Sequence, residues 1–485
     1  MTQSDKGLPE AVRRVFTEAD QARFAALSGD HNPMHLDPVA ARRTLAAVPV
    51  VHGMHLLIWA LDAFAASEGE LPPVTALRAN FSKFVPVGEE VSLVVGKRKP
   101  SSVQLKIVAG GTTRSDVTVQ FGAVTNEQEP LLPADLPLVE APSSALLFKA
   151  EDGDCRGLLP FVGDLAEYAA AFPDAAQWIG VERLAALGAS TLLVGMICPG
   201  LHSIYAGLRI MLFRDVAPSH GLRFETGPVE HGLITSTIEG GGIRGTVEAL
   251  VRNPPTAQPS YAELIGTIPG DAFSGSHVLI VGGSRGLGEL TAKLIAAGGG
   301  HVIITWRVGN AEAEVVAAEI IAGGGRCATL PYDVFADAEP QISTLDEAPT
   351  HAYYFAAPSI ARPNSIFFDA ARLRDLQHVF IDGFWSLAKA LQGRREDVRL
   401  FYPSTTFITD RPKGMAEYAM AKAAGEILCA EMNATMAPLA VIAGRLPRLL
   451  TDQTAGTVPK GSGPSVAALL PLILQVQNVA AAQPE

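Results

Sequence analysis

The sequence is poor in cysteine. Its 485 residues include only Cys155, Cys198, Cys327 and Cys429, with no CxxC motif and no Cys/His spacing typical of a metal site. This excludes a disulfide framework and favours a reducing compartment. We therefore expect a cytoplasmic protein that binds no metal.

Long apolar runs and basic clusters are also missing. No apolar stretch reaches the roughly 20 residues that span a bilayer, and the N-terminus lacks the apolar core of a signal peptide. The net charge is −12, and the run Lys97-Arg98-Lys99 is too short to form a phosphate-binding surface. We expect neither a membrane nor a nucleic acid as partner.

What the sequence does contain is enough apolar material for several cores. Hydrophobic residues make up 48% of the chain and charged residues 18%, as in well-packed globular enzymes. Single cores rarely exceed about 250–300 residues, so this length predicts two to four domains. Two Pro-rich linkers separate three segments, which we place at residues 1–128, 145–253 and 275–485.

The first two segments resemble each other. Ala76-Leu77-Arg78 recurs 131 positions later as Gly207-Leu208-Arg209, and Gly110-Gly111 recurs at the same offset as Gly241-Gly242. Each copy begins with an apolar helical stretch, at 50–64 and 187–205, and continues in strands of alternating pattern. We interpret this as an internal duplication in which one antiparallel sheet per copy wraps a buried helix.

The third segment has a different pattern. Apolar strands alternate with helical stretches from about residue 275 to the end of the chain, which predicts a parallel sheet covered by helices on both faces.

A polar run near the N-terminus carries the first chemical signal. It reads Gly29-Asp30-His31-Asn32-Pro33-Met34-His35, and His52-Gly53 follows just before the first apolar helix. A carboxylate and an imidazole five residues apart on an Asn-Pro turn can face one small volume and exchange protons there. The alternative is purely structural, with Asp30 and Asn32 capping a short helix near Pro38 and His35 a turn residue. Asp37 is the better cap.

This run resembles the signature of the MaoC-like (R)-specific enoyl-thioester hydratases, which have the hot-dog fold. The resemblance implies that Asp30 handles the proton of the hydroxyl and His35 the proton at Cα. It assigns the backbone N–H of Gly53 to the developing enolate oxygen, a role suited to a helix start. The second copy lacks the motif and has Cys198 and His202 instead, which are either a catalytic couple or, as we prefer, buried helix residues. One active centre in a double hot-dog fold follows.

The second signal is a glycine-rich turn between a strand and a helix. Such a turn lets the backbone approach a pyrophosphate at the helix N-terminus. The residues that we assign to nucleotide binding here are Gly282, Ser284, Arg285, Gly286, Leu287 and Gly288. Asp333-Val334 follow the third strand, and Tyr418 and Lys422 lie one turn apart on a later helix.

Together these features resemble the short-chain dehydrogenase/reductase family, with a Rossmann-type doubly wound parallel α/β sheet. The resemblance implies that Tyr418 exchanges a proton with a carbonyl or alcohol, that Lys422 lowers its pKa and contacts the cofactor, and that a hydroxyl holds the substrate carbonyl. Thr405 has the usual spacing for this hydroxyl and Ser404 the usual residue type, so both stay open.

The cofactor is expected to be NADP(H). Trp306-Arg307 follows the second strand, where an NAD-specific site would have an acidic residue, and Arg285 and Arg307 can both face a 2′-phosphate. Several positions depart from the family pattern, namely Val281, Phe355-Ala356-Ala357-Pro358 and Asp382.

We therefore predict a bifunctional enzyme that acts on acyl-CoA or acyl-carrier-protein thioesters, as a homodimer. Its reductase would convert a 3-oxoacyl to an (R)-3-hydroxyacyl group, and its hydratase would remove water to give the trans-2-enoyl product, or both would run in reverse. In one alternative the reductase-like domain is only a nucleotide-binding scaffold. In another, the hot-dog pair only binds or hydrolyses thioesters.

Overall fold

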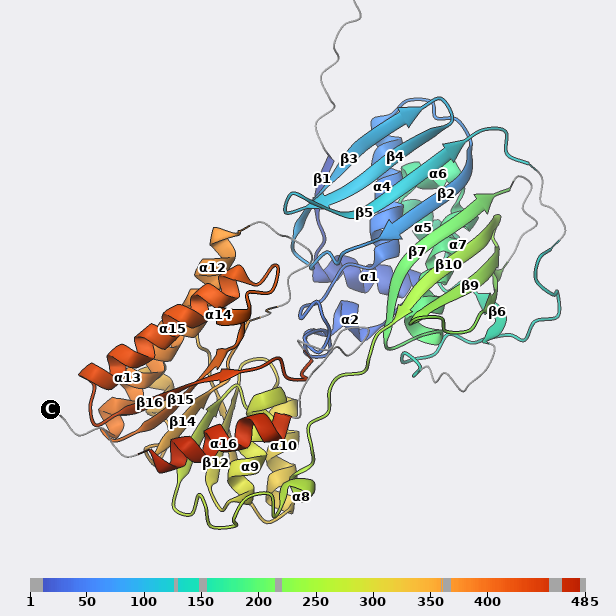
Figure 1. Cartoon of the computed structure of the whole chain (residues 1–485). Helices are drawn as coiled ribbons and strands as arrows, with labels where there is room; N and C mark the ends of the chain where they lie inside the picture. The colour runs from blue at the N-terminus through green and yellow to red at the C-terminus, as the bar shows by residue number, and fades with distance from the viewer. Residues whose placement is uncertain are drawn as a thin grey trace, which may run out of the picture. The chain divides into compact units, whose positions relative to one another are not determined.

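The computed structural model describes residues 12–125, 130–147, 155–213, 220–358, 360, 368–452 and 465–479. The chain divides into two compact units, Met1–Pro254 and Pro255–Glu485. Figure 1 shows the first with its strands in blue to green and the second in yellow to red.

The first unit contains one ten-stranded sheet in which every neighbouring pair is antiparallel. The strand order is β1-β3-β4-β5-β2-β7-β10-β9-β8-β6. The strands are β1 (Val12–Val15), β2 (Val74–Phe81), β3 (Glu90–Lys99), β4 (Ser102–Ala109), β5 (Thr112–Phe121), β6 (Arg156–Pro160), β7 (Ser203–Leu212), β8 (Gly221–Thr226), β9 (Leu233–Gly240) and β10 (Ile243–Val251).

The two repeats meet at the centre of this sheet. The order of the first five strands, read outward from β2, matches that of the last five, read outward from β7. At the joint Arg78 pairs with Arg209, the residue 131 positions later. The paired glycines serve the same purpose in each copy, since all four have positive φ and turn β4 into β5 and β9 into β10. The repeats inferred from the sequence are thus related by an approximate twofold axis through β2 and β7.

Two apolar helices, α4 and α7, pack on one face of the sheet (Figure 1) and share one hydrophobic core with it. In β4 every second side chain points into this core, as a strand covered on one face requires. The helices are α1 (Glu18–Ser28), α2 (Pro33–Leu36), α3 (Pro38–Ala41), α4 (Gly53–Ser67), α5 (Leu165–Ala171), α6 (Pro173–Ile179), α7 (Val181–Leu192) and the π-helix η1 (Leu193–Ile197).

The helix predicted at 187–205 is wrong at its C-terminal end. Helical structure stops at Ile197, and a turn with a cis peptide between Cys198 and Pro199 leads into β7 at Ser203. Pro199 cannot donate to a helical carbonyl, and the helix ends before it.

The second unit contains a six-stranded sheet in which all strands are parallel. The order is β13-β12-β11-β14-β15-β16, so the chain reverses its direction across the sheet between β11 and β14. The strands are β11 (His277–Val281), β12 (His301–Trp306), β13 (Arg326–Pro331), β14 (His351–Tyr354), β15 (Arg399–Thr405) and β16 (Ala440–Leu446).

Helices cover both faces of this sheet, and each face has its own core. In β11, Val278 and Ile280 face the core shared with α9, α10 and α16, whereas Leu279 and Val281 face that of α11, α12, α13 and α15. The helices are α8 (Tyr261–Leu264), α9 (Gly286–Ala297), α10 (Asn310–Ala322), α11 (Ala338–Ile342), α12 (Ala370–Gln377), η2 (His378–Gly383), α13 (Phe384–Arg394), α14 (Phe407–Asp410), α15 (Ala416–Thr435) and α16 (Ser465–Asn478).

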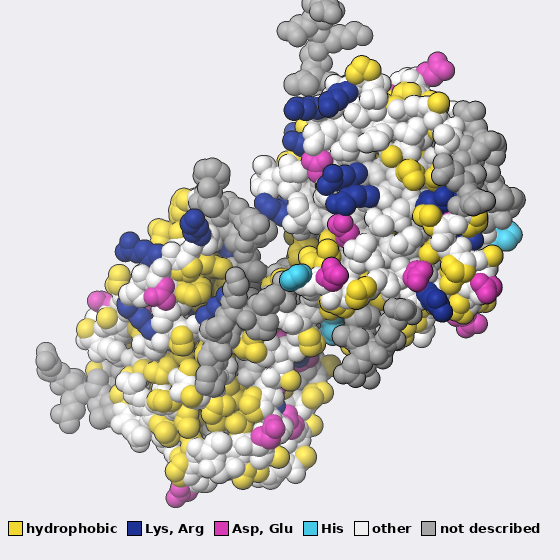
Figure 2. Space-filling model, turned by 45° about the vertical axis from the view of Figure 1, so that its right-hand side comes forward, with side chains coloured by type: hydrophobic (Ala, Val, Ile, Leu, Met, Phe, Trp, Pro, Cys, Tyr) yellow, Lys and Arg dark blue, Asp and Glu magenta, His cyan; other side chains and the backbone are white. Residues whose placement is uncertain are grey.

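Within the described ranges, no single helix is long and apolar enough to cross a membrane. Only Pro173–Ile179 and Val181–Ile197 taken together meet the length and hydropathy limits, and they are bent by 108°. On the face in Figure 2, Lys and Arg side chains form small separate groups with acidic side chains between them rather than one broad basic surface.

Candidate active sites

The loop that carries Asp30 begins where α1 ends. Gly29 adopts a left-handed conformation with φ 82° and closes the helix, so the chain turns sharply. The Asp30 N–H then donates to Ser28 Oγ at 3.2 Å, and the Asp30 carbonyl accepts from His52 Nε2 at 3.0 Å. Asp30 is only 1% exposed. Its backbone is thus held on both sides before any substrate is present.

Asn32 fastens the loop to the second repeat. Its side-chain oxygen accepts from Met34 N and caps α2, while its side-chain N–H group donates to the carbonyls of Gly195 at 2.7 Å and Gly200 at 3.2 Å. These carbonyls lie within and just after η1. Asn32 therefore positions the loop, and Asp37, not Asp30, caps the helix at Pro38.

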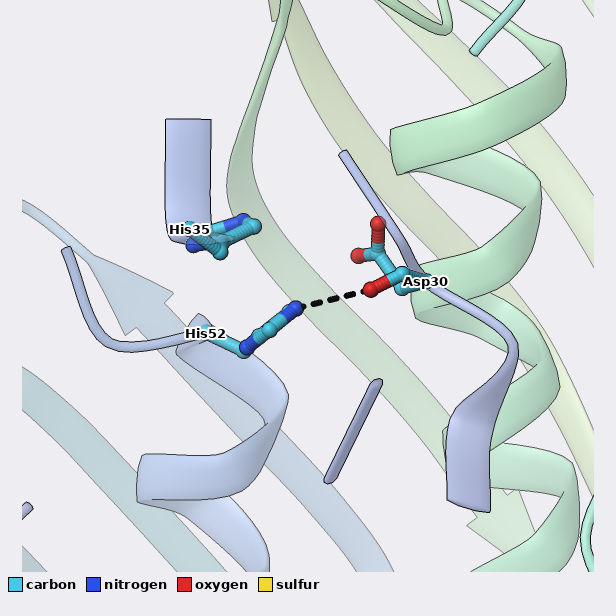
Figure 3. Close-up of side chains that lie close together, drawn as sticks. All are labelled: Asp30, His35 and His52. Carbon is cyan, nitrogen blue, oxygen red and sulfur yellow. Dashed lines mark hydrogen bonds between the residues drawn. The ribbon is translucent and has the colours of Figure 1, made fainter. Parts of the chain in front are cut away.

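His35 faces the same volume as Asp30 (Figure 3). Its Nδ1 lies 2.7 Å from the Val50 carbonyl and donates to it, since a carbonyl only accepts. The neutral ring then has its lone pair on Nε2. One carboxylate oxygen of Asp30 and one nitrogen each of His35 and His52 lie within 4.8 Å of one another. The structure thus brings together the predicted acid/base pair.

Burial shifts the pKa of both groups. It raises the pKa of Asp30, against the opposing effects of the His35 charge and of hydrogen bonds from Thr191 and Asn32. It lowers the pKa of His35, against the effects of Asp30 and of the bond to Val50. The raised pKa favours the protonated form of Asp30, which can donate a proton, and the lowered pKa favours the neutral form of His35, which can accept one.

His52 contacts both members of this pair. Its ring stacks on that of His35, with 3.7 Å between the centroids. Both of its nitrogens contact protein oxygens, Nε2 the Asp30 carbonyl and Nδ1 Gln21 Oε1 at 2.9 Å. With these nitrogens engaged, and with Nδ1 of His35 bound to Val50, the cluster suits proton transfer better than metal binding.

Gly53 begins α4, and its N–H has no hydrogen-bond partner in the described part of the chain. The side chain of His52, the preceding residue, does not cap the helix. A β-carbon at Gly53 would lie 3.1 Å from the Phe81 ring, so a larger residue at this position would crowd that ring. A free N–H at a helix start is a suitable donor for an oxyanion.

Cys198 and His202 do not form a catalytic couple. Cys198 is 1% exposed, and its thiol contacts Cys155 and Thr226. His202 lies beyond the cis proline, where burial and the Arg252 charge lower its pKa to about 4. The expectation that both are buried helix residues is wrong in part, because both lie in the turn between η1 and β7 and only Cys198 is buried.

In the second unit the glycine-rich turn joins β11 to α9. Gly282 and Gly286 have φ values of 83° and 60°, which favour glycine. A β-carbon at Gly282 would lie 2.9 Å from Ala356 N, and one at Gly283 would lie 2.7 Å from Ile304. Ser284 is 6% exposed, Gly288 is buried and Leu287 packs on the core. No side chain caps α9, so its N–H groups face the turn.

The two arginines assigned to a 2′-phosphate each lie near an aspartate. Arg285 Nη1 lies 3.5 Å from Asp452, and Arg307 Nη1 lies 3.6 Å from Asp333. The Arg307 side chain is 52% exposed and packs over Phe335 at the end of β12. Val334 follows Asp333 and approaches η2 at Gly383. This edge of the sheet therefore combines an uncapped helix start with two arginines.

Tyr418 and Lys422 share one face of α15, and the Lys422 ammonium lies 6.0 Å from the centre of the Tyr418 ring. Its ammonium donates to the Pro403 carbonyl at 2.7 Å and lies over the rings of Phe380 and Tyr402. Burial lowers the pKa of Lys422 to about 7 and raises that of Tyr418 to about 12. The effect of the Lys422 charge on the pKa of Tyr418 stays a prediction.

The two candidate hydroxyls point in different directions. The Thr405 hydroxyl opposes the raising effect of burial on the pKa of Tyr418, and its Oγ1 accepts from Phe407 N at 3.2 Å. Ser404 instead donates to Glu426 at 2.5 Å, and Glu426 also pairs with Arg445 at 2.7 Å. Only Thr405 accompanies the tyrosine. No motif in the sequence indicates Glu426, because its contacts depend on which strands lie beside α15.

Comparisons with known proteins find the most similar sequences for the N-terminal part of the chain. Residues 3–119 match the model of the MaoC like domain. The chain is 56% identical over 50 residues to an (R)-specific enoyl-CoA hydratase of Aeromonas caviae, over 10% of this chain and 37% of that protein. It is 31% identical over 121 residues to 3-hydroxyacyl-thioester dehydratase Y of Mycobacterium tuberculosis, over 24% and 42%. It thus spans less than half the length of these relatives. The predicted resemblance to MaoC-like hydratases is confirmed.

Solved structures are similar to part of the chain. A short-chain dehydrogenase/reductase from Serratia marcescens has a TM-score of 0.39 and 16% identity, covering 44% of this chain and 96% of its own. A 3-oxoacyl (acyl-carrier-protein) reductase from Agrobacterium tumefaciens with NADP bound has a TM-score of 0.35 and 20% identity, covering 38% and 74%. At scores this low, the fold of the second unit is judged from its own strand order.

Proposed function

We propose that the first unit is a double hot-dog hydratase/dehydratase for acyl thioesters, with one active centre at Asp30 and His35. The convergence of these two side chains carries the proposal, together with the free N–H of Gly53. The domain at 1–128 supplies the catalytic groups, and the domain at 145–253 supplies the carbonyls and the hydroxyl that hold the Asp30 loop.

In the dehydration direction, His35 Nε2 removes the proton at Cα of a 3-hydroxyacyl thioester. Asp30 in its protonated form gives a proton to the departing hydroxyl, which leaves as water. The N–H of Gly53 donates to the thioester oxygen while that oxygen carries negative charge. In the hydration direction Asp30 accepts a proton from water and the imidazolium of His35 returns one to Cα. The raised pKa of Asp30 and the lowered pKa of His35 both support this division.

Hydration of a trans-2-enoyl thioester tests the proposal. General acid/base groups contribute about 10²- to 10⁴-fold, so Asp30→Asn and His35→Ala should each lose at least ~10²-fold in kcat. His31→Gln, at the exposed neighbouring histidine, is the control and should stay near the wild-type rate. Full hydration by Asp30→Asn would contradict the role of Asp30, whereas a wild type that hydrates no enoyl thioester would support a domain that only binds or hydrolyses thioesters.

For the second unit we propose a Rossmann-type short-chain reductase, over residues 275–485, that uses NADP(H). The order of its parallel strands places the turn Gly282 to Gly288 at the point where the strand direction reverses, a usual position for a dinucleotide. The closely packed glycines and the uncapped start of α9 fit a pyrophosphate, and Arg285 and Arg307 fit a 2′-phosphate. When bound, the dinucleotide supplies the hydride.

In this proposal Tyr418 gives a proton to the carbonyl oxygen of a 3-oxoacyl thioester, and Thr405 holds that oxygen through its hydroxyl. Lys422 holds the ribose side of the nucleotide. The product is the (R)-3-hydroxyacyl thioester, which is the substrate of the first unit. The two reactions in sequence give the trans-2-enoyl thioester on CoA or on a carrier protein, and the chain works as a homodimer.

Incubation with a 3-oxoacyl-CoA and NADPH tests the reductase. We expect loss of the reduced-nicotinamide absorbance, and its abolition in Tyr418→Phe with hydration intact. The second candidate function is a nucleotide-binding scaffold, which the diversion of Ser404 to Glu426 and the enclosure of Lys422 favour. In that case NADPH binds with no turnover, and Tyr418→Phe changes nothing.

A further inference from the structure

A hydroxyl from the second repeat reaches the catalytic carboxylate. Thr191 lies near the end of α7, is 3% exposed, and donates from Oγ1 to Asp30 Oδ2 at 2.7 Å. The two residues are 161 positions apart and belong to different copies of the duplication. The other carboxylate oxygen, Oδ1, accepts from Asn32 N at 3.1 Å. Each oxygen of Asp30 thus has one donor, which fixes the rotation of the carboxylate.

The neighbouring residue shows that this contact differs from ordinary helix packing. Ser190 donates to the Leu187 carbonyl of its own helix at 2.7 Å, as buried helical hydroxyls commonly do. Thr191 turns its hydroxyl outward to Asp30 instead. Its β-branched side chain has few rotamers in a helix, so the hydroxyl is held in place at little further entropic cost.

We propose that Thr191 is a positioning residue of the hydratase site, so that the copy without the Asp/His motif completes the site of the copy that has it. This inference rests on the proposed hydratase function. Thr191 touches neither of the reacting carbons. It acts through Asp30, by aiming the remaining lone pairs of the carboxylate toward His35 and by stabilising the ionised form.

The effect on pH dependence has a definite sign. A hydroxyl that donates to a carboxylate favours the charged form and lowers its pKa, here against the raising effect of burial. The titratable groups around Asp30 are His31, His35 and His52. Thr191 carries no charge, so its removal raises the Asp30 pKa without changing the surrounding charges.

The test compares Thr191→Val, which removes the hydroxyl at equal size, with Thr191→Ser, which keeps it. Hydration of a trans-2-enoyl-CoA is measured across pH. A hydrogen bond to a charged group is worth roughly 10- to 100-fold, so we expect that loss in kcat for Thr191→Val, with KM within about twofold. The acid limb of its rate profile should move to higher pH, and Thr191→Ser should restore both.

Ser190→Ala is the matched control, since it removes an adjacent buried hydroxyl without touching Asp30, and its pH profile should not move. Thermal unfolding of each variant checks the fold, and Thr191→Ala replaces Thr191→Val if the latter does not fold. A Thr191→Val profile equal to that of the wild type overturns the inference.

The carboxyl titration of Asp30, followed by ¹³C NMR and assigned with Asp30→Asn, separates this inference from the proposed function. An upward shift in Thr191→Val supports the positioning role even if the wild type hydrates nothing, in which case only the proposed function fails. An unshifted Asp30 in an active wild-type background refutes the role of Thr191 alone.

Discussion

Gly195 offers a sharp test of how closely the two repeats fit at the active site. It lies in η1, and its carbonyl accepts from Asn32. A β-carbon at this position would come within 2.5 Å of Asp30 Oδ2 and closer still to Oδ1. Ordinary contact begins at 3.4 Å, so in Gly195→Ala the carboxylate must move by about 1 Å, or the helix must shift by as much.

A displacement of ~1 Å at a catalytic group costs about 10²-fold in rate. We therefore expect Gly195→Ala to lose ~10²-fold in kcat for enoyl-thioester hydration. Overpacking a buried site costs ~1–3 kcal/mol in the free energy of unfolding, so the variant should still fold. Steady-state kinetics and thermal unfolding, measured side by side, separate the two effects.

Gly69→Ala is the control, because a β-carbon there meets nothing within 4 Å. It should keep the wild-type rate and stability. If Gly195→Ala hydrates as fast as the wild type, the position of the Asp30 carboxylate does not depend on the second repeat.

Three further predictions concern both units. Thr405→Val should lower 3-oxoacyl reduction more than tenfold and Ser404→Ala less than threefold, in the same NADPH assay, because Thr405 influences the pKa of Tyr418 whereas Ser404 is bound to Glu426; the reverse order would return the role to Ser404. Lys422→Met should raise the free energy of unfolding by at least ~1 kcal/mol at pH 7. The pKa of Lys422 is about 7 in the folded protein and 10.5 is its usual value, so the unfolded wild type binds more protons than the folded one between pH 7 and 10.5. The wild type therefore gains stability as pH rises, and the advantage of the variant should shrink toward pH 10 in urea titrations. A stability difference that does not change with pH would contradict the lowered pKa. A chelator should leave the hydration rate unchanged, since the contacts of His52 leave too few ligands for a metal; inactivation restored by added zinc would refute this.

Local sequence was enough to locate the acid/base pair. Asp30 and His35 are five residues apart, so one turn determines whether they converge, and the Asn-Pro bend makes that turn. The duplication could also be recognised, because the same short pattern recurs at a fixed offset around Arg78 and Arg209. These two residues occupy equivalent strands that pair at the centre of the sheet. Features that depend on short separation or on repetition could be predicted.

Contacts between distant segments could not. Thr191 is an ordinary helical threonine in the sequence, and its bond to Asp30 appears only when the repeats pack together. The aromatic enclosure of Lys422 combines Phe380 from η2 with Tyr402 from β15, which no local pattern in the sequence brings together. The helix end near Pro199 was missed because apolar periodicity continued past a proline that should have ended it.

The joint between β2 and β7 has a consequence for how the first unit can be divided. Residues 76–80 of β2 hydrogen-bond along their length to residues 207–211 of β7. Separating the halves would expose an unpaired, partly apolar strand edge on each fragment, a surface prone to self-association. The duplicated halves therefore cannot be treated as exchangeable modules. Either one produced alone would tend to rebuild the missing edge with another copy of itself, or precipitate.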